Sequence, residues 1–284
     1  ITAVNDAPTL TTFTVPFAST NEDIEVEITF ANLLAQGDAA DIDGTVNAFV
    51  IKAVSTGTIK IGTSAGVATA WNASSNATID ATKKAYWTPA SNFNGTLNAF
   101  TAVAKDNDGL ESATAVQVVV SVILVNDAPV ITTSGSLSYT EAVAAAAIQP
   151  SLTLSDVDDT QITGGSISLT NPVTGDTLSF TNTGTITGIF SGGVLTLTGT
   201  DTLANYQAAL REICFSSTSN DPTVNGTRPT RTVTFSVTDA NGSSGANGQQ
   251  TGTTTSIINI TAVNDAPTLT TFTVPFASTN EDIE

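Results

Sequence analysis

The sequence predicts an all-β fold made of two tandem antiparallel β-sandwiches in a linear array. Apolar and polar residues alternate with a period of two along several segments, which is the pattern of half-buried strands. The stretch VNDAP occurs three times, at intervals typical of single domains. Thr, Val, Ile, Ser, Asn and Gly are abundant, and 40% of the residues are apolar, which is too hydrophobic for a disordered chain.

The clearest strand signals in the first half lie near its beginning and its end. In EDIEVEITF, the apolar residues Ile24, Val26, Ile28 and Phe30 alternate with Glu and Thr, which predicts one strand over 24–30. AVQVVVSVILV continues the pattern with apolar residues at every second position: Val116, Val118, Val120, Val122 and Leu124. Each segment therefore has one buried face and one wet face.

The second half shows the same alternation and one interruption. Val233, Phe235 and Val237 alternate within RTVTFSVTD, and Ile258 and Ile260 do so near the end of the module. Within TLANYQAALREI, apolar residues instead recur at spacings of three and four: Leu203, Tyr206, Leu210 and Ile213. This spacing predicts one short helix near 202–212, with Thr200 or Thr202 as its N-cap.

Repeated segments set the expected domain boundaries. ITAVNDAPTLTTFTVPFASTNEDIE occurs at Ile1–Glu25 and again, without a mismatch, at Ile260–Glu284. The chain is therefore interpreted as one turn of a longer repetitive array. The three VNDAP stretches divide it into modules 1–126 and 127–263, and the predicted first (A) strand of a further module lies within 264–284.

Composition excludes several classes of function. The net charge of -18 disfavours nucleic acid and anionic lipid as partners, because both attract basic proteins. Histidine is absent and Cys214 is the only cysteine, so an internal disulfide framework and Cys–His or Ser–His catalysis lack their usual residues. No signal peptide is visible, and no apolar run reaches the ~20 residues that cross a bilayer, so membrane insertion is not expected.

Acidic residues gather in predicted turns at the ends of the sandwiches. The join between the modules is expected to bring one group around Asn126 and Asp127: Glu22, Asp156, Asp158, Asp159 and Asp239. Unit charges ~4 Å apart repel by about 4 kcal/mol at an effective dielectric of 20. Ca²⁺ accepts six to eight oxygen ligands in flexible geometry, whereas Mg²⁺ prefers water and Zn²⁺ prefers His or Cys. Each Asp taken alone is also an ordinary turn residue.

Several motifs together resemble a known family. The VNDAP linker, NEDI, DIDG, YWTPASNFNG and FTAVAKDNDG resemble the cadherin-like repeats of giant bacterial surface adhesins of the RTX type. SDVDD, LANYQAALREICF and VTFSVTDANG resemble a second variety of such repeats. The resemblance covers nearly the whole chain and implies a cadherin/Ig-like fold. The RTX nonapeptide GGxGxD is absent, and Asn98 stands where the family often carries Asp.

The resemblance implies calcium ligands at each end of each module. For the first join, they are Glu22, Asn126, Asp127, Asp156 and Asp158, with Asp239 as a further candidate. For the second join, they are Glu141, Asp221, Asn264 and Asp265. At the leading end, Asn5, Asp6, Asp41, Asp43 and Asp106 make half of a site.

These observations favour a calcium-rigidified extender in an extracellular adhesin or fibre on the bacterial surface. Its partners would be neighbouring repeats of the same chain. One alternative is a glycan- or protein-binding adhesion module, with Trp71 in the region 64–85 as the place to look. Another is a self-assembling sheath or surface-layer subunit, in which the repeated segment exchanges strands between molecules. Enzymatic activity is disfavoured, and Trp87 and Cys214 are expected to be structural.

Overall fold

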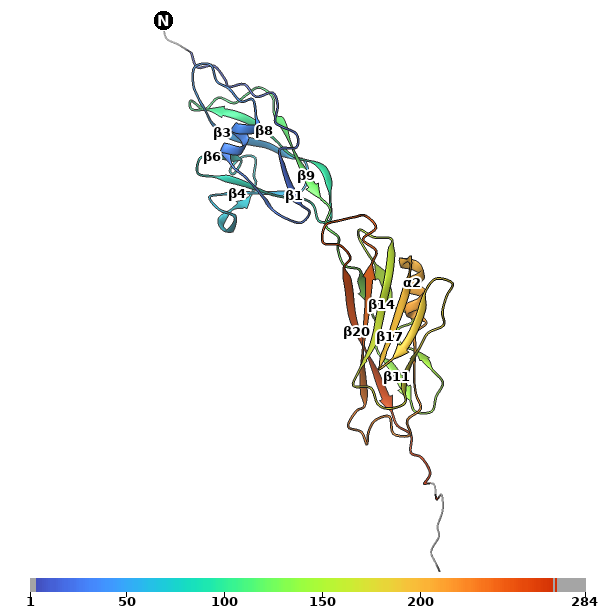
Figure 1. Ribbon diagram of the computed structural model, residues 1–284. Helices are drawn as coiled ribbons and strands as arrows, with labels where there is room; N and C mark the ends of the chain where they lie inside the picture. The colour runs from blue at the N-terminus through green and yellow to red at the C-terminus, as the bar shows by residue number, and fades with distance from the viewer. Residues whose placement is uncertain (1–3, 268, 270–284) are drawn as a thin grey trace, which may run out of the picture. The chain divides into compact units, whose positions relative to one another are not determined.

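The computed structural model describes residues 4–267 and 269. Residue contacts divide the chain into two units, each built almost entirely of β-strands (Figure 1). The first unit comprises Ile1–Ala128, Val157–Asp159 and Asn241–Gln250, and the second comprises Pro129–Asp156, Thr160–Ala240 and Thr251–Glu284. Most of 264–284, the predicted start of a further module, lies outside the described residues.

The first unit consists of two facing sheets. Its elements are β1 (Ala18–Asn21), β2 (Val26–Ile28), α1 (Phe30–Gln36), β3 (Val46–Val54), β4 (Thr58–Gly62), the 3₁₀ turn η1 (Ala65–Val67), β5 (Thr69–Ala70), β6 (Thr78–Asp80), β7 (Lys84–Thr88), β8 (Gly95–Asp106) and β9 (Val116–Ile123). One sheet has the order β1-β9-β8-β3-β6 and the other β2-β7-β4-β5. Phe49 and Phe100 of one sheet and Trp87 of the other share a single core, which identifies a β-sandwich.

One predicted strand of this unit is shorter than expected. The alternation over 24–30 yields only β2, Ile24 is 56% exposed, and Phe30 begins the helix α1. The reason is local: the Thr29 side chain accepts a hydrogen bond from the backbone N–H of Asn32, and the Asn32 side chain accepts one from the N–H of Thr29. This reciprocal cap favours helix, and it places Leu33 in the core.

The second unit has a six-stranded sheet of order β11-β20-β19-β14-β17-β16, a three-stranded sheet β12-β18-β15 and the pair β10-β13. Its elements are β10 (Val130–Thr132), β11 (Leu137–Thr140), β12 (Ala146–Ala147), β13 (Thr153–Ser155), β14 (Gln161–Thr170), β15 (Asp176–Ser179), β16 (Thr187–Ser191), β17 (Val194–Thr202), α2 (Leu203–Arg211), β18 (Cys214–Ser217), β19 (Thr230–Asp239) and β20 (Thr251–Thr261). The all-β prediction is therefore confirmed for both units.

The predicted helix of the second module is also confirmed. Helix α2 spans Leu203–Arg211, and the side chain of Thr202 caps it by accepting a hydrogen bond from the N–H of Asn205. It packs against β13, β14 and β17 (Figure 1). Tyr206 and Leu210 of this helix are fully buried. No helix among the described residues is long and apolar enough to cross a membrane.

Candidate metal centre

A buried glutamate follows the first strand of the first unit. Strand β1 pairs in parallel with β9, and Glu22 comes directly after it, with its N–H donating to the carbonyl of Ile123 at 3.0 Å. The Glu22 side chain is 4% exposed, and its Oε1 accepts a hydrogen bond from the N–H of Val125, the first residue of the central VNDAP. Its Oε2 is buried and has no hydrogen-bond partner. One oxygen of this carboxylate is therefore available to a cation.

The surroundings of Glu22 disfavour its charged form. Burial raises the pKa of Glu22, and the negative charges of Asp158, Asp127 and Asp23 raise it further, against the lowering effect of the Val125 N–H. The net pKa lies above 4.5, the ordinary value for this group. A bound cation would instead lower the pKa of Glu22, because its positive charge favours the ionised carboxylate.

The linker residues beside Glu22 are held by backbone and side-chain hydrogen bonds of the first unit. The N–H of Asp127 donates to Oδ2 of Asp158 at 2.7 Å. Asn126 is buried, its N–H donates to the carbonyl of Ala246, and its Nδ2 donates to the carbonyl of Gly248, both at 2.9 Å. Carboxylate and amide oxygens, the ligand types that Ca²⁺ prefers, are thus concentrated near the linker.

Three further carboxylates come together where β13 and β19 end. Asp156, Asp159 and Asp239 each offer an oxygen, and these oxygens lie within 4.8 Å of one another. Asp159 and Asp239 are buried, and Oδ1 of Asp159 accepts a hydrogen bond from the N–H of Gly242 at 2.6 Å. At this spacing each pair of full charges repels by about 3–4 kcal/mol at an effective dielectric of 20. All three were predicted ligands, and their chemistry fits a hard divalent cation.

The leading end of the first unit holds a similar group. Nδ2 of Asn5 donates to Oδ2 of Asp106 at 2.8 Å, and the N–H of Asp6 donates to the carboxylate of Asp43 at 3.2 Å. Burial alone would raise the pKa of Asp106, but hydrogen bonds from Asn5 and from the backbone of residues 108–110 bring it below its ordinary value. Oδ2 of Asp41 is buried without a hydrogen-bond partner, so this group also has a free acceptor.

The second unit repeats the buried glutamate. Strand β11 pairs in parallel with β20, and the N–H of Glu141, the next residue after β11, donates to the carbonyl of Thr261 at 2.9 Å. Glu141 is 6% exposed, and its Oε2 accepts from the N–H of Val263 at 2.8 Å.

The other predicted ligands near this end are not joined to Glu141. Asp221 accepts hydrogen bonds from Thr223 and Asn225 of its own loop. Among the described residues, no hydrogen bond or ion pair links Asp221 to Glu141, Asn264 or Asp265, and these four residues remain predictions as ligands.

Sequence reasoning missed two residues that shape the leading group. Oδ1 of Asn107 accepts from the N–H of Thr45 at 2.8 Å and so ties the loop after β8 to the start of β3. A Cβ atom on Gly44 would lie 2.8 Å from that oxygen and 2.9 Å from Oδ2 of Asp41. The available signal was the pair of turns DIDG and KDNDG, in which glycine and asparagine accompany the acids.

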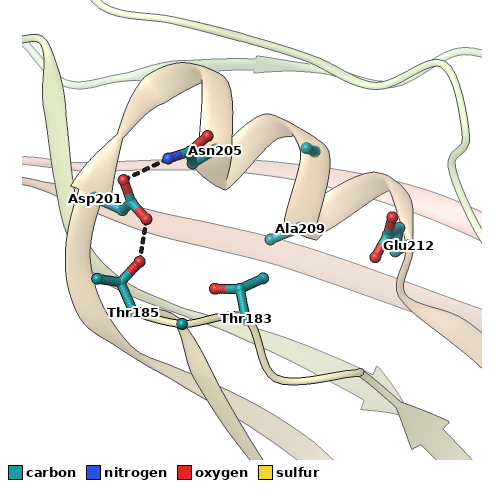
Figure 2. A pocket seen from close by; sticks show the side chains of 8 residues that line it. Thr183, Thr185, Asp201, Asn205, Ala209 and Glu212 are labelled. Carbon is teal, nitrogen blue, oxygen red and sulfur yellow. Dashed lines mark hydrogen bonds between the residues drawn. The ribbon is translucent and has the colours of Figure 1, made fainter.

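A separate pocket of about 280 Å³ lies between α2 and the 183–185 turn (Figure 2). Two acidic residues, Asp201 and Glu212, line it. The carboxylate of Asp201 accepts hydrogen bonds from Thr185, from Nδ2 of Asn205 at 2.7 Å and from the N–H of Thr202 at 2.8 Å. These bonds lower the pKa of Asp201, with the Thr185 hydroxyl contributing most. The pocket contains none of the predicted metal ligands, and the Asp201 carboxylate holds the start of α2 through its bonds to Thr202 and Asn205.

The remaining candidates of the sequence are built into the framework. Trp87 is fully buried, and its Nε1 donates to the carbonyl of Thr56 at 2.7 Å. Trp71 is half-buried, and its Nε1 donates to the carbonyl of Ile51 at 3.3 Å. Cys214 is half-buried between the fully buried Ile213 and Phe215, and burial raises the pKa of its thiol. These environments are those of packing residues.

No protein-family model and no curated protein matches the chain. Among solved structures, it is similar to human mucin-like protocadherin EC1-2, at 14% identity over 90% of this chain and 98% of that one, with a TM-score of 0.34. It is also similar to mouse cadherin-23 EC22-24, at 15% identity over 92% and 68%, with a TM-score of 0.37. The protocadherin gammaB4 extracellular domain is similar at 15% identity over 93% of this chain and 34% of that one, with a TM-score of 0.38. At TM-scores this low, the similarity carries no argument about function.

Proposed function

We propose that this chain is an extracellular extender module pair of a large bacterial surface adhesin or fibre, and that bound calcium stiffens it. One observation carries the proposal: the buried carboxylate of Glu22 has an oxygen without a hydrogen-bond partner and lies within the field of Asp127 and Asp158. Burying an uncompensated carboxylate among like charges is unfavourable, and a divalent cation removes that cost.

The linker would be stiffened because the ligands belong to segments far apart in the sequence. Glu22 follows the first strand, Asp127 lies in the linker and Asp158 precedes β14. A cation held by all three would tie these distant segments of the first unit to the linker and so restrain its backbone. Extracellular calcium modules bind at about 10⁻⁴–10⁻³ M, which suits a site that is filled outside the cell.

The two remaining acidic groups would bind calcium in the same way. Asp156, Asp159 and Asp239 would hold calcium through carboxylate oxygens, as would Asp41, Asp43 and Asp106 at the leading end. An all-oxygen set without His or Cys favours Ca²⁺ over Zn²⁺. The net charge of -18 also opposes lateral association of a β-rich chain, which suits a solvated spacer.

Calorimetric titration of the full chain with CaCl₂, in parallel with MgCl₂, tests the binding step. We expect calcium affinity in the range of about 10⁻⁴–10⁻³ M, weaker magnesium binding, and loss of at least one calcium site in Glu22→Gln. Glu212→Gln removes the same charge from an exposed position outside these groups and serves as the control.

Small-angle X-ray scattering with calcium and then with chelator tests the mechanical step. Calcium should convert a broad distribution of maximum dimensions into a narrow, extended one. Identical profiles in the two conditions, or a calcium response retained in full by Glu22→Gln, would overturn the proposal.

A further inference from the structure

Two lysines of the first unit differ from the others in having no acidic partner. All the lysines of the chain belong to this unit, and most of them form ion pairs, in the combinations Lys52–Glu111, Lys60–Glu25 and Lys84–Glu27. Within the described part of the chain, the side-chain nitrogens of Lys83 and Lys105 form neither an ion pair nor a hydrogen bond. Acids outnumber bases by 26 to 8 in this chain, so two ammonium groups without an acidic partner are exceptions.

Both of these lysines line one pocket of about 160 Å³ on the five-stranded sheet, in which β8, β3 and β6 are neighbours (Figure 1). Val50 also lines it and belongs with Val103 to a small apolar cluster. The main core instead contains Phe49 and Ile51, the residues on either side of Val50, so the small cluster is on the opposite face of the sheet. Lys105 follows Val103 by two residues along β8 and shares that face. The pocket is therefore on the outer face of the sandwich, where a ligand can reach it.

The loop that carries Ser74 and Ser75 forms one wall of the pocket. Oδ1 of Asn72 accepts hydrogen bonds from the N–H groups of both serines, at 3.0 and 3.2 Å. Nδ2 of Asn76 donates to the carbonyl of Thr69 at 3.1 Å and so joins the loop to β5. The backbone of the loop is thus held in place, while the hydroxyl groups of the two serines form no hydrogen bond within the described residues. They are available to a ligand that has hydroxyl groups of its own.

The charges that line this pocket favour an anion. Among the described residues that line it, Glu111 is the one acid, and its carboxylate is paired with Lys52. The ammonium groups of Lys83 and Lys105 have no such compensation. At physiological ionic strength, exposed charges more than ~8 Å away are largely screened, so the net charge of -18 does not decide which ions bind here. Each ammonium group has three hydrogen-bond donors and suits an oxyanion, such as a carboxylate or a sulfate ester.

A second pocket, of about 310 Å³, adjoins the first and carries the opposite charge. The two pockets share Lys105, and the second is also lined by Asp80 and Asp108. Burial alone would raise the pKa of Asp80, but hydrogen bonds from Thr82 and from the N–H of Lys83 bring it below its ordinary value. An anionic group in the first pocket would therefore need a neutral neighbour in the second, because these carboxylates would repel a further anion.

We propose that the two pockets together bind an acidic saccharide. A sugar residue with a carboxylate or a sulfate ester lies in the first pocket, with its oxyanion on Lys83 and Lys105, and an uncharged sugar residue lies in the second. The hydroxyl groups of Ser74 and Ser75 bind hydroxyl groups of the acidic residue. The first pocket is smaller than the ~300–1,000 Å³ of typical small-molecule sites, which suits one sugar residue. This binding uses one face of the first unit and does not depend on the calcium function proposed above.

Calorimetric titration of the full chain with four tetrasaccharides tests the proposal. A hyaluronan fragment alternates a carboxylate with an uncharged sugar, and a κ-carrageenan fragment alternates a sulfate ester with an uncharged sugar. A galacturonan fragment carries a charge on every residue, and a cellulose fragment carries none. We expect one of the two alternating fragments to bind at least about tenfold more tightly than galacturonan and cellulose, and the tighter of the two identifies the anionic group. Any other order of affinities, or no binding at all, would overturn the proposal.

Matched variants locate the site. Lys83→Gln with Lys105→Gln should weaken binding of the preferred fragment at least about tenfold, because its hydrogen bonds to two charged groups are lost. Lys60→Gln with Lys84→Gln removes the same charge from the other sheet, on β4 and β7, and should leave the affinity unchanged. Equal losses in the two double variants would count against the site. Glu22→Gln should bind the fragment as wild type does, which separates this proposal from the calcium function.

A nuclear magnetic resonance titration of the unmodified chain needs no substitution. The preferred fragment should shift the backbone amide signals of Ser74, Ser75 and Lys83 and leave those of β4 (Thr58–Gly62) in place. Shifts confined to other parts of the chain would contradict the assignment. A tetraglutamate peptide offers carboxylates without sugar hydroxyls and should bind at least about tenfold more weakly than the preferred fragment. Equally tight binding would assign the pocket to acidic peptides and overturn the saccharide proposal.

Discussion

The two units anchor their first strand in the same way but stabilise their interiors differently. In each, a strand pairs in parallel with the last strand, and a buried glutamate then accepts a hydrogen bond from the valine of a VNDAP stretch: Glu22 from Val125 and Glu141 from Val263. The largest fully buried side chain is Trp87 in the first unit and Arg231 in the second.

These two side chains satisfy their polar atoms by different means. Trp87 makes one hydrogen bond to a carbonyl, whereas Nε of Arg231 lies 2.6 Å from Oδ2 of the fully buried Asp176. The same guanidinium donates to the carbonyls of Arg228, Thr230 and Pro222, and so holds the loop before β19. The hydrogen bond between the buried glutamate and the VNDAP valine is therefore the same in both units, although their cores are stabilised differently.

The largest expected effect comes from breaking the buried ion pair. Arg231→Ala should lower the free energy of unfolding of the second unit by about 3–5 kcal/mol, because it leaves Asp176 charged, buried and unpaired. Urea denaturation measures this loss. Arg231→Met with Asp176→Leu should cost less than Arg231→Ala alone, and a larger cost for the double variant would contradict the expectation.

Removing a calcium ligand should have the next largest effect. At 10 mM calcium and a dissociation constant of about 0.1–1 mM, one site adds about 1.4–2.7 kcal/mol to the stability of the folded state. We expect Glu22→Gln to lose most of this gain in thermal unfolding monitored with and without chelator. Glu212→Gln should keep it, and equal calcium responses in the two variants would count against Glu22 as a ligand.

The stability of the first unit, measured in chelator, should depend on pH through Glu22, and this effect should be smaller than the two above. The folded-state pKa of Glu22 is raised above 4.5, so its contribution to stability is present in full below pH 4.5 and is lost as pH rises through the folded pKa. Glu22→Gln should therefore flatten the stability profile of the first unit above pH 4.5. Parallel profiles for wild type and variant would show that the carboxylate does not titrate in this way.

Asp38 should show the opposite sign and the smallest effect. Its pKa is lowered from 3.8 to about 2, chiefly by the Thr11 hydroxyl and then by the N–H groups of Thr11 and Thr12. The stabilisation is therefore present above pH 3.8 and lost as pH falls through about 2. Asp38→Asn should destabilise the first unit at pH 7, and the difference from wild type should disappear near pH 2. A difference that is constant with pH would exclude this contribution.

Patterns with a local cause were predictable, and those with a local competitor were not. Helix α2 was predicted because its apolar residues recur at spacings of three and four after a capping threonine, Thr202. The strand predicted over 24–30 was cut short because Thr29 and Asn32 form a helix cap inside an alternating pattern. The spacing of apolar residues indicates which side chains are buried. It does not indicate whether a cap will turn the backbone from strand into helix.

The same distinction between local and long-range causes applies to the candidate site. That the acids lie in turns follows from the sequence, since Asp, Asn and Gly in SDVDD and KDNDG favour turns wherever they occur. Which atom each acid meets does not follow, because the partners of Glu22 and Asp127 are 103 and 31 residues away along the chain. No local rule specifies such contacts.

The sequence by itself determined the all-β character, the short helix, the repeat and the acidic turns, because each depends on neighbouring residues. Only the tertiary structure decided that β1 and β11 run parallel to the last strand of their units and carry Glu22 and Glu141 into the interior. Burial belongs to the surroundings that the fold assembles from segments far apart in the sequence, so no local pattern specifies it.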